Sequence, residues 1–288
     1  MTSKDQTFTS FTPEQAAAYA SNRGRAYPSA LYSRILEYHT GSRDVFFDVG
    51  TGPGKVVFDL LPFFKKGLGC DAGVGMIEQA KKGRRSSRSR GEDKLCHLRR
   101  REAVHWFDLP KFYESAAKVL KPGGTLAMWT ASSIFVHPSA PSHKELQEII
   151  SDLGDNLLGP YHVPGNLLSQ GAYDKLQLPW DFSETQGLFE KASFHRRDWD
   201  RDGVSSAPPL EDGTPGPFLL GREATLDQFT AALGSASSVI RFREAHPEKA
   251  HGEEDPINIT TRRLREVMGE NEKVNGGPSC HLLLMRRS

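Results

Sequence analysis

The residues with the clearest potential for chemistry lie between positions 48 and 71. The segment Asp48-Val-Gly50-Thr51-Gly52-Pro-Gly54 overlaps the end of the apolar run Val45–Val49, which is typical of a strand buried on both faces of a parallel sheet. Glycines at a strand-to-helix turn let the backbone approach a ligand and aim helix N–H groups at it. Asp71 follows Gly52 by 19 residues, at the end of the next predicted strand, where a carboxylate can accept ribose hydroxyls. The pattern predicts an adenosine-containing ligand.

The spacing of the glycines narrows the choice of ligand. In the dinucleotide fingerprint GxGxxG the third glycine would stand at position 55, which is Lys55. The spacing present is GxGxG, with an acid two residues before the first glycine. This version is typical of S-adenosylmethionine sites, which have no pyrophosphate to bind. The alternative is a tight turn without a ligand.

The predicted elements that position these residues alternate along the chain. Periodicity, caps and breakers predict helices at 12–19, 29–38, 55–64 (bent or ended near Pro62), 75–82, 110–120, 143–153, 225–245 and 260–268. They predict strands at 45–49, 67–71, 125–130, 188–195 and 280–286. A strand, glycine turn, helix and strand in succession form a right-handed βαβ unit. The fold class is therefore α/β, with a Rossmann-like, mostly parallel sheet and helices on both faces.

Composition excludes several classes of protein. The chain of 288 residues is 37% hydrophobic and 25% charged, as in ordinary globular proteins, and its net charge of +1 gives no general attraction to nucleic acid or membranes. Three distant cysteines fit neither a disulfide framework nor a metal site, so we expect no metal. A polar N-terminus and the lack of a run of ~20 apolar residues predict a cytoplasmic protein without a membrane span.

Further stretches, together with the glycine motif, resemble class I S-adenosylmethionine-dependent methyltransferases, specifically the trans-aconitate methyltransferase-like group common in fungi. The matching stretches are Phe8–Gln15, Tyr19–Pro28, Gly75–Ala80, Ala103–Asp108, Val119–Thr125 and Phe242–Pro247. The resemblance implies a single domain over residues 1–288. Its expected parts are an N-terminal cap (1–40), a cofactor-binding core (41–135, with an irregular basic insert at 83–101), and substrate-side helices with the final strands (136–288).

The resemblance also implies roles for individual residues around the cofactor S-adenosyl-L-methionine. Gly50, Thr51, Gly52 and Gly54 would line its methionine and ribose, Asp48 would hold its amino group, and Asp71 would bind the ribose. Tyr19 and Arg25 would cap the site, His105 and Trp106 would close over the methyl donor, and Trp129 and Thr130 would shape the acceptor pocket.

Structural roles compete with several of these assignments. Trp106 and Trp129 can be core aromatics, and His105 can be a hydrogen-bonded structural histidine. Asp48 can be a strand-end acid satisfied by backbone N–H groups.

The reaction that the resemblance implies is methyl transfer to an oxygen of a small metabolite. A carboxylate acceptor is already ionised at pH 7, so that alignment and exclusion of water would suffice. A phenol would need a base, for which His105 is the candidate.

One stretch departs from the family pattern. Residues 81–101 contain ten Lys or Arg and two acidic residues, a net charge of +8 against −7 for the rest of the chain. A third strand, a helix and a fourth strand would need roughly 25–35 residues here. The composition predicts no buried strand, so the fourth, central strand of the sheet is expected to be missing. A short substitute third strand at Leu95–Leu98 is the alternative. The segments at Val45 and Thr125 would then pair directly or leave backbone groups unsatisfied.

Three explanations for the basic stretch remain open: a solvated loop, a nucleic-acid contact, or a misread exon. Two rival functions also remain beside small-molecule methylation. One is a methyltransferase-like protein that has lost turnover, and the other is a nucleic-acid methyltransferase.

Overall fold

The computed structural model describes residues 27–86, 92–97, 104–271 and 273–288. The chain divides into two compact units. The first consists of Met1–Met128, Leu176–Arg196 and Leu283–Ser288, and the second of Trp129–Lys175 and Arg197–Leu282. The helix predicted at 12–19 lies outside the described residues.

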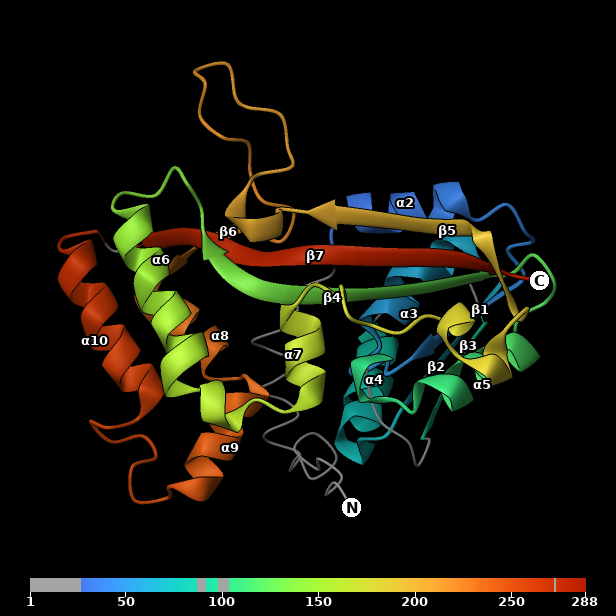
Figure 1. Cartoon of the computed structure of the whole chain (residues 1–288), viewed down its shortest axis with the longest axis horizontal. Helices are drawn as coiled ribbons and strands as arrows, with labels where there is room; N and C mark the ends of the chain where they lie inside the picture. The colour runs from blue at the N-terminus through green and yellow to red at the C-terminus, as the bar shows by residue number, and fades with distance from the viewer. Residues whose placement is uncertain (1–26, 87–91, 98–103, 272) are drawn as a thin grey trace. The chain divides into compact units, whose positions relative to one another are not determined.

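The first unit contains a parallel sheet that carries the glycine motif. Its strands are β1 (Val45–Val49), β2 (Lys66–Asp71) and β3 (Glu92–His97), in the order β1-β2-β3 (Figure 1). The register pairs Asp48 with Gly69 and Val49 with Cys70. Parallel pairing therefore brings the carboxyl ends of β1 and β2, and with them the glycine bend and Asp71, to one edge of the sheet.

Four helices of this unit follow from local sequence signals. They are α2 (Ser29–Tyr38), α3 (Lys55–Leu60), α4 (Val74–Ser86) and α5 (Leu109–Val119). α2 has the predicted bounds and buries Leu31 and Ile35 one turn apart. α3 ends before Pro62 in a 3-10 turn, as predicted. Asp108 caps α5 by accepting the backbone N–H of Lys111.

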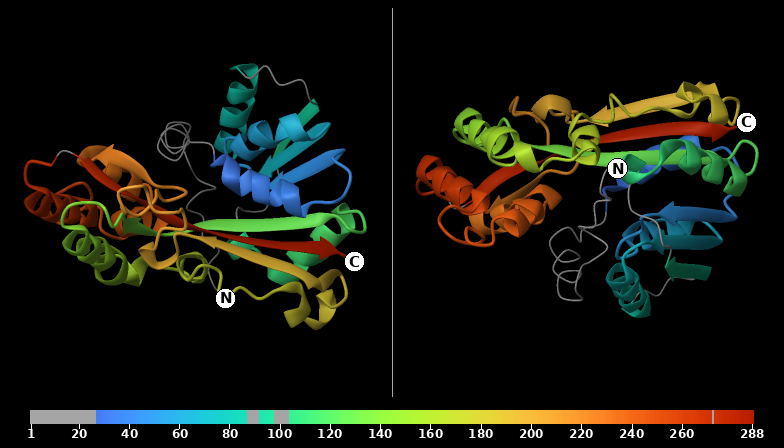
Figure 2. Two further views of the ribbon diagram at one scale, coloured as in Figure 1. Left: turned by 90° about the horizontal axis from the view of Figure 1, so that it is seen from above. Right: turned by 60° about the horizontal axis from the view of Figure 1, so that its bottom comes forward.

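Three long strands form a second sheet. β4 (Thr125–Val136), β7 (Lys273–Arg287) and β5 (Phe189–Trp199) lie in the order β4-β7-β5, and β6 (Arg222–Thr225) pairs with β7. β7 runs antiparallel to both neighbours, as Figures 1 and 2 show. The Gly123 N–H donates to Arg287 and the His137 N–H to Asn275, which joins β4 to β7 near both ends.

The second unit is a helical layer with its own apolar core. Its helices are α6 (His143–Asp152), α7 (Pro164–Gln170), α8 (Leu226–Leu233), α9 (Ser237–Ala245) and α10 (Pro256–Met268). Buried side chains of α6, α8, α9 and α10 pack with Val136 and Val274. The single helix predicted over 225–245 is wrong, because the chain turns at 234–236 and begins again as α9. In the described part of the chain, no helix is long and apolar enough to cross a membrane.

The α/β class with a parallel sheet is confirmed, but the expected burial of β1 on both faces is wrong. The side chains of Val45, Phe47 and Val49, which alternate along β1 and so share one face, are 51%, 39% and 37% exposed. β3 forms by pairing with β2 within the basic stretch, where no buried strand was predicted and a short strand at 95–98 was the alternative. In the described residues no strand lies beside the outer edge of β1. β1 and β4 belong to different sheets, so direct pairing, one of the two expected consequences of a missing fourth strand, does not occur.

Candidate functional site

The glycine bend between β1 and α3 is anchored on one side and open on the other. The N–H groups of Gly50 and Thr51 both donate to the Cys70 carbonyl, at 2.8 and 2.9 Å. Gly54 has φ +82°, and a Cβ there would stand 3.1 Å from Ala80 and from Phe58. Gly52 has φ +53°, but a Cβ there would meet nothing within 4 Å. Conformation therefore requires glycine at both positions, and the space beside Gly52 is open to a ligand.

Asp71 holds this bend in place. Its Oδ2 accepts the Gly52 N–H and its Oδ1 accepts the Gly73 N–H, both at 2.8 Å, and the residue is 3% exposed. The carboxylate thus joins the bend to the start of α4. Backbone N–H donors of this kind were the structural alternative for Asp48, and the structure places them on Asp71.

Asp48 has the opposite environment. Its Oδ2 is buried without a hydrogen-bond partner, and so is the Oγ1 of Thr51. Burial raises the pKa of Asp48 to about 6, the nearby charge of Asp71 adds to this rise, and the Thr51 hydroxyl opposes it. A buried carboxylate oxygen without a donor is costly unless a ligand supplies one. The bend is therefore suited to a ligand that brings a cationic N–H group to Asp48.

His105 and Trp106 form a second group, on the 3-10 turn Val104–Trp106. Their ring centroids are 5.3 Å apart, and both residues are half-buried. Burial lowers the pKa of His105 to about 4, so the imidazole is neutral at pH 7. Tyr19 and Arg25 lie outside the described residues.

Trp129 and Thr130 lie on β4 at the start of the second unit. The Thr130 Oγ1 is 2.6 Å from the Ser169 Oγ, and the Ser132 hydroxyl donates to the Ser169 carbonyl at 2.7 Å. Thr130 is 5% exposed, whereas Trp129 is half-buried. The Thr130 hydroxyl thus joins β4 to α7, which is a structural role.

A serine, a histidine and an aspartate on β5 and β7 also have the bonding order of hydrolase triads. The Ser279 Oγ lies 2.9 Å from His281 Nε2, and His281 Nδ1 lies 2.8 Å from Asp198 Oδ1. Ser279 and His281 are 2% and 1% exposed, and the serine hydroxyl is hydrogen-bonded to the histidine ring on the same strand. The set is a buried network whose polar groups satisfy one another.

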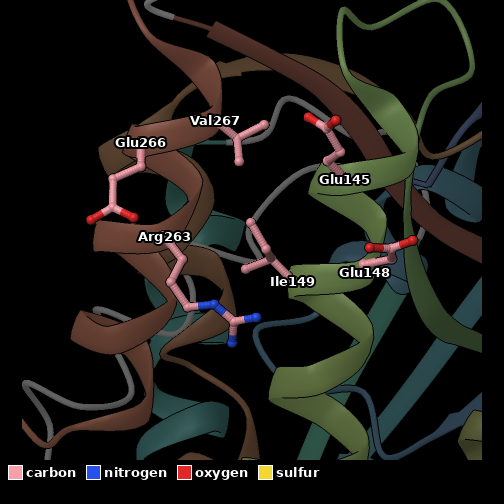
Figure 3. Close-up of a pocket in the computed structure, with 6 residues that line it drawn as sticks. All are labelled: Glu145, Glu148, Ile149, Arg263, Glu266 and Val267. Carbon is pink, nitrogen blue, oxygen red and sulfur yellow. The ribbon is translucent and has the colours of Figure 1, made fainter.

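A groove of about 280 Å³ lies between α6 and α10 in the second unit (Figure 3). Its lining residues are Glu145, Glu148, Ile149, Arg263, Glu266 and Val267. The three glutamates are exposed, and Arg263 is paired with Asp152. The groove contains none of the predicted site residues and is a solvated charged surface. Within the ranges that the structure describes, no cluster of His, Cys, Asp and Glu could hold a metal ion.

The sequence analysis missed a contact close to the bend. The Tyr32 hydroxyl donates to Asp59 Oδ2 at 2.9 Å and joins α2 to α3. The two residues are 27 positions apart, and no motif links them, so the pattern offers no signal for this contact.

Comparisons with known proteins agree with the geometry of the bend. No family model matches the chain. The chain is 30% identical over 273 residues to the Saccharomyces cerevisiae protein named "Probable S-adenosylmethionine-dependent methyltransferase CRG1", and the match covers 87% of each. It is 28% identical over 153 residues to methyltransferase pgmE of Aspergillus terreus, 45% of each protein.

A solved structure supports the fold. It comes from Anaeromyxobacter dehalogenans and is named as that of a type II methyltransferase. It superimposes with a TM-score of 0.61 at 22% identity, over 91% of this chain and 97% of that one.

Proposed function

The chain belongs to the S-adenosylmethionine-dependent methyltransferases, and on that premise we propose that it methylates an oxygen, carboxylate or phenol, of a small metabolite. The resemblance to the trans-aconitate methyltransferase-like group supports this choice of acceptor. The observation that carries the placement of the cofactor is the buried, unpartnered Oδ2 of Asp48 beside an open glycine bend.

The residues of the bend fit S-adenosylmethionine. Asp48 Oδ2 has no hydrogen-bond donor within the protein, and the α-ammonium group of the cofactor would supply one. The open space beside Gly52 would admit the methionine portion of the cofactor. A carboxylate can accept about four hydrogen bonds, so holding the bend and receiving a ribose hydroxyl are compatible roles for Asp71. When bound, the cofactor supplies an electrophilic methyl group. The protein's own residues position it and exclude water.

The acceptor decides whether a base is needed. A carboxylate acceptor is ionised at neutral pH and needs only to be aligned with the methyl group. For a phenol, neutral His105 could take up the proton, and Trp106 beside it could cover the reacting groups. Because its pKa is about 4, His105 would be a weak base. A carboxylate acceptor needs no base, so it suits this site better than a phenol.

Replacing His105 by glutamine tests the base role. We expect the rate of methyl transfer to a carboxylic acid to change less than about twofold, because that acceptor carries no proton to remove. Transfer to a phenol should fall by roughly 10²–10⁴-fold if His105 is the base. Initial rates with labelled methyl donor measure both, and a variant whose rates on both acceptors equal those of the wild type would rule out the base role of His105.

The affinity for the cofactor should depend on pH through Asp48. Its raised pKa means that the carboxyl is neutral below about pH 6 and charged above it. Since an ammonium group pairs with the charged form, lowering the pH from 7.5 to 5 should weaken binding of S-adenosylhomocysteine about tenfold. Titration calorimetry between pH 5 and 8 measures this.

The Asp48→Asn variant is the matched control for that titration. It should bind about tenfold more weakly at pH 7.5 and lose the pH dependence over this range. A flat profile for the wild-type protein would show that Asp48 does not hold the amino group.

The proposed function is tested by two measurements on the full chain. Calorimetry with S-adenosylmethionine establishes binding, and labelled transfer to a panel of small acids and phenols establishes turnover. Binding without transfer to any member would favour the rival protein that has lost turnover. Methylated product identifies the acceptor class and supports the proposal.

A further inference from the structure

A part-buried hydrogen bond joins α2 to α3, the helix that follows the glycine bend. The Tyr32 side chain is buried on α2, at 6% exposure, and its hydroxyl donates to Asp59 Oδ2 at 2.9 Å. Burial is the main reason why the pKa of Tyr32 is raised, so the hydroxyl keeps its proton and remains a donor at any pH near neutrality. A hydrogen bond from a neutral donor to a carboxylate is among the stronger kinds.

Tyr32 also lies within electrostatic range of one residue of the site. Asp48 is close enough to the hydroxyl to add to the rise in its pKa. The ring of Tyr27 meets the ring of Tyr32 edge-on, with centroids 6.5 Å apart and planes at 83°. This ring contact joins the segment before α2 to the helix itself.

The partner residue connects this contact to the bend. Asp59 lies in α3, a helix of six residues that begins immediately after left-handed Gly54. Because α3 is short and starts at the bend, its orientation sets the direction of the backbone from Gly50 to Gly54. A restraint on Asp59 is therefore a restraint on the bend.

We propose that Tyr32 is a positioning residue of the cofactor site, which holds α3, and through it the Gly50–Gly54 bend, by its hydrogen bond to Asp59. The inference rests on the proposed placement of the cofactor at that bend. The proposal gives α2, which lies outside the glycine motif, a role in cofactor binding.

The test compares variants that lose a tyrosine hydroxyl, and the hydrogen bond it donates, at two places in the first unit. Tyr32→Phe removes the donor at the bend. Tyr113 is also a buried tyrosine, and its hydroxyl donates to the Gln177 carbonyl at 2.8 Å. Tyr113→Phe removes that hydroxyl. Calorimetry with S-adenosylhomocysteine gives the dissociation constant, and thermal unfolding gives the stability of each variant.

We expect Tyr32→Phe to weaken binding about tenfold, and Tyr113→Phe to change it less than twofold at a similar loss of stability. Asp59→Asn, which keeps an acceptor oxygen, should bind within about threefold of the wild type, and Asp59→Ala should resemble Tyr32→Phe. The Tyr32→Phe/Asp59→Ala double variant should bind no more weakly than either single variant.

The outcomes distinguish the inference from the proposed function. Wild-type protein that does not bind S-adenosylhomocysteine would overturn the placement of the cofactor itself. If the wild type and Tyr32→Phe bound S-adenosylhomocysteine with equal affinity, only the positioning role of Tyr32 would be overturned. Equal weakening by Tyr32→Phe and Tyr113→Phe would do the same, because it would show a general effect of stability.

Discussion

Replacing Asp71 by alanine is expected to abolish cofactor binding and to destabilise the first unit. The substitution removes the acceptor for the Gly52 and Gly73 N–H groups, in a residue that is 3% exposed. Each buried N–H left without a partner costs about 1–3 kcal/mol, so we expect the two to lower the free energy of unfolding by roughly 2–6 kcal/mol. This is a large part of the ~5–15 kcal/mol typical of a whole protein.

The effect on binding should exceed the effect of Asp48→Asn. Without Asp71 the bend loses its connection to α4, and the ligand loses the carboxylate that we propose for its ribose. We expect the dissociation constant for S-adenosylhomocysteine to rise by more than about 100-fold, since two charged hydrogen bonds and the shape of the bend are lost together. Urea unfolding and calorimetry, made below the unfolding transition, separate the two effects.

Asp212→Ala is the matched control. Asp212 also accepts a backbone N–H, that of Thr214 at 2.9 Å, but it is exposed and belongs to the second unit. The loss there should stay below about 1 kcal/mol, because water replaces the acceptor, and binding should not change. If Asp71→Ala kept near-normal affinity, the ribose role and the role in shaping the bend would both be wrong.

The sequence predicted the glycine bend and its neighbours because their signals are local. An apolar run, a glycine turn and an amphipathic helix specify β1, the bend and α3, and parallel register then places Asp71 beside Gly52. The division of roles between the two acids could not be predicted, since it depends on the direction in which the N–H groups of the bend point. Asp71 receives the Gly52 N–H, the Cys70 carbonyl receives those of Gly50 and Thr51, and the Oδ2 of Asp48 is left without a donor.

The errors have a common physical origin in tertiary pairing. Glu92–His97 lacks the apolar alternation of a strand, yet it pairs with β2 along its whole length, because neighbours outweigh intrinsic preference in a sheet. Val45–Val49 was expected to be buried on both faces, but burial of a face depends on what the fold packs over it, and the face with Val45, Phe47 and Val49 is exposed. The contact of Tyr32 with Asp59 is likewise a product of the fold.

The motif Phe242–Pro247, one of the stretches that resemble the family, contains an arginine with a structural role. Asp255, which caps α10 and is fully buried, accepts the Arg243 Nε–H at 2.7 Å and Nη2–H at 3.2 Å. It also accepts the backbone N–H groups of His251 and Ile257, at 2.8 and 2.9 Å. Burial acts to raise the pKa of Asp255, but these donors outweigh it and hold the pKa below its usual value.

The Arg243→Ala variant should therefore lose about 3–5 kcal/mol in the free energy of unfolding at pH 7, because it leaves a buried carboxylate without its counter-ion. The pair stabilises the wild-type protein fully above the unfolded-state pKa of Asp255, and this contribution disappears as the pH falls through the lowered folded-state pKa. Lys249→Ala is the control, since it breaks an exposed 2.7 Å pair with Glu254 in the same unit and should cost less than about 1 kcal/mol. Urea unfolding of both variants decides the matter: equal losses would mean that Asp255 is satisfied by the backbone donors alone and that Arg243 has another role.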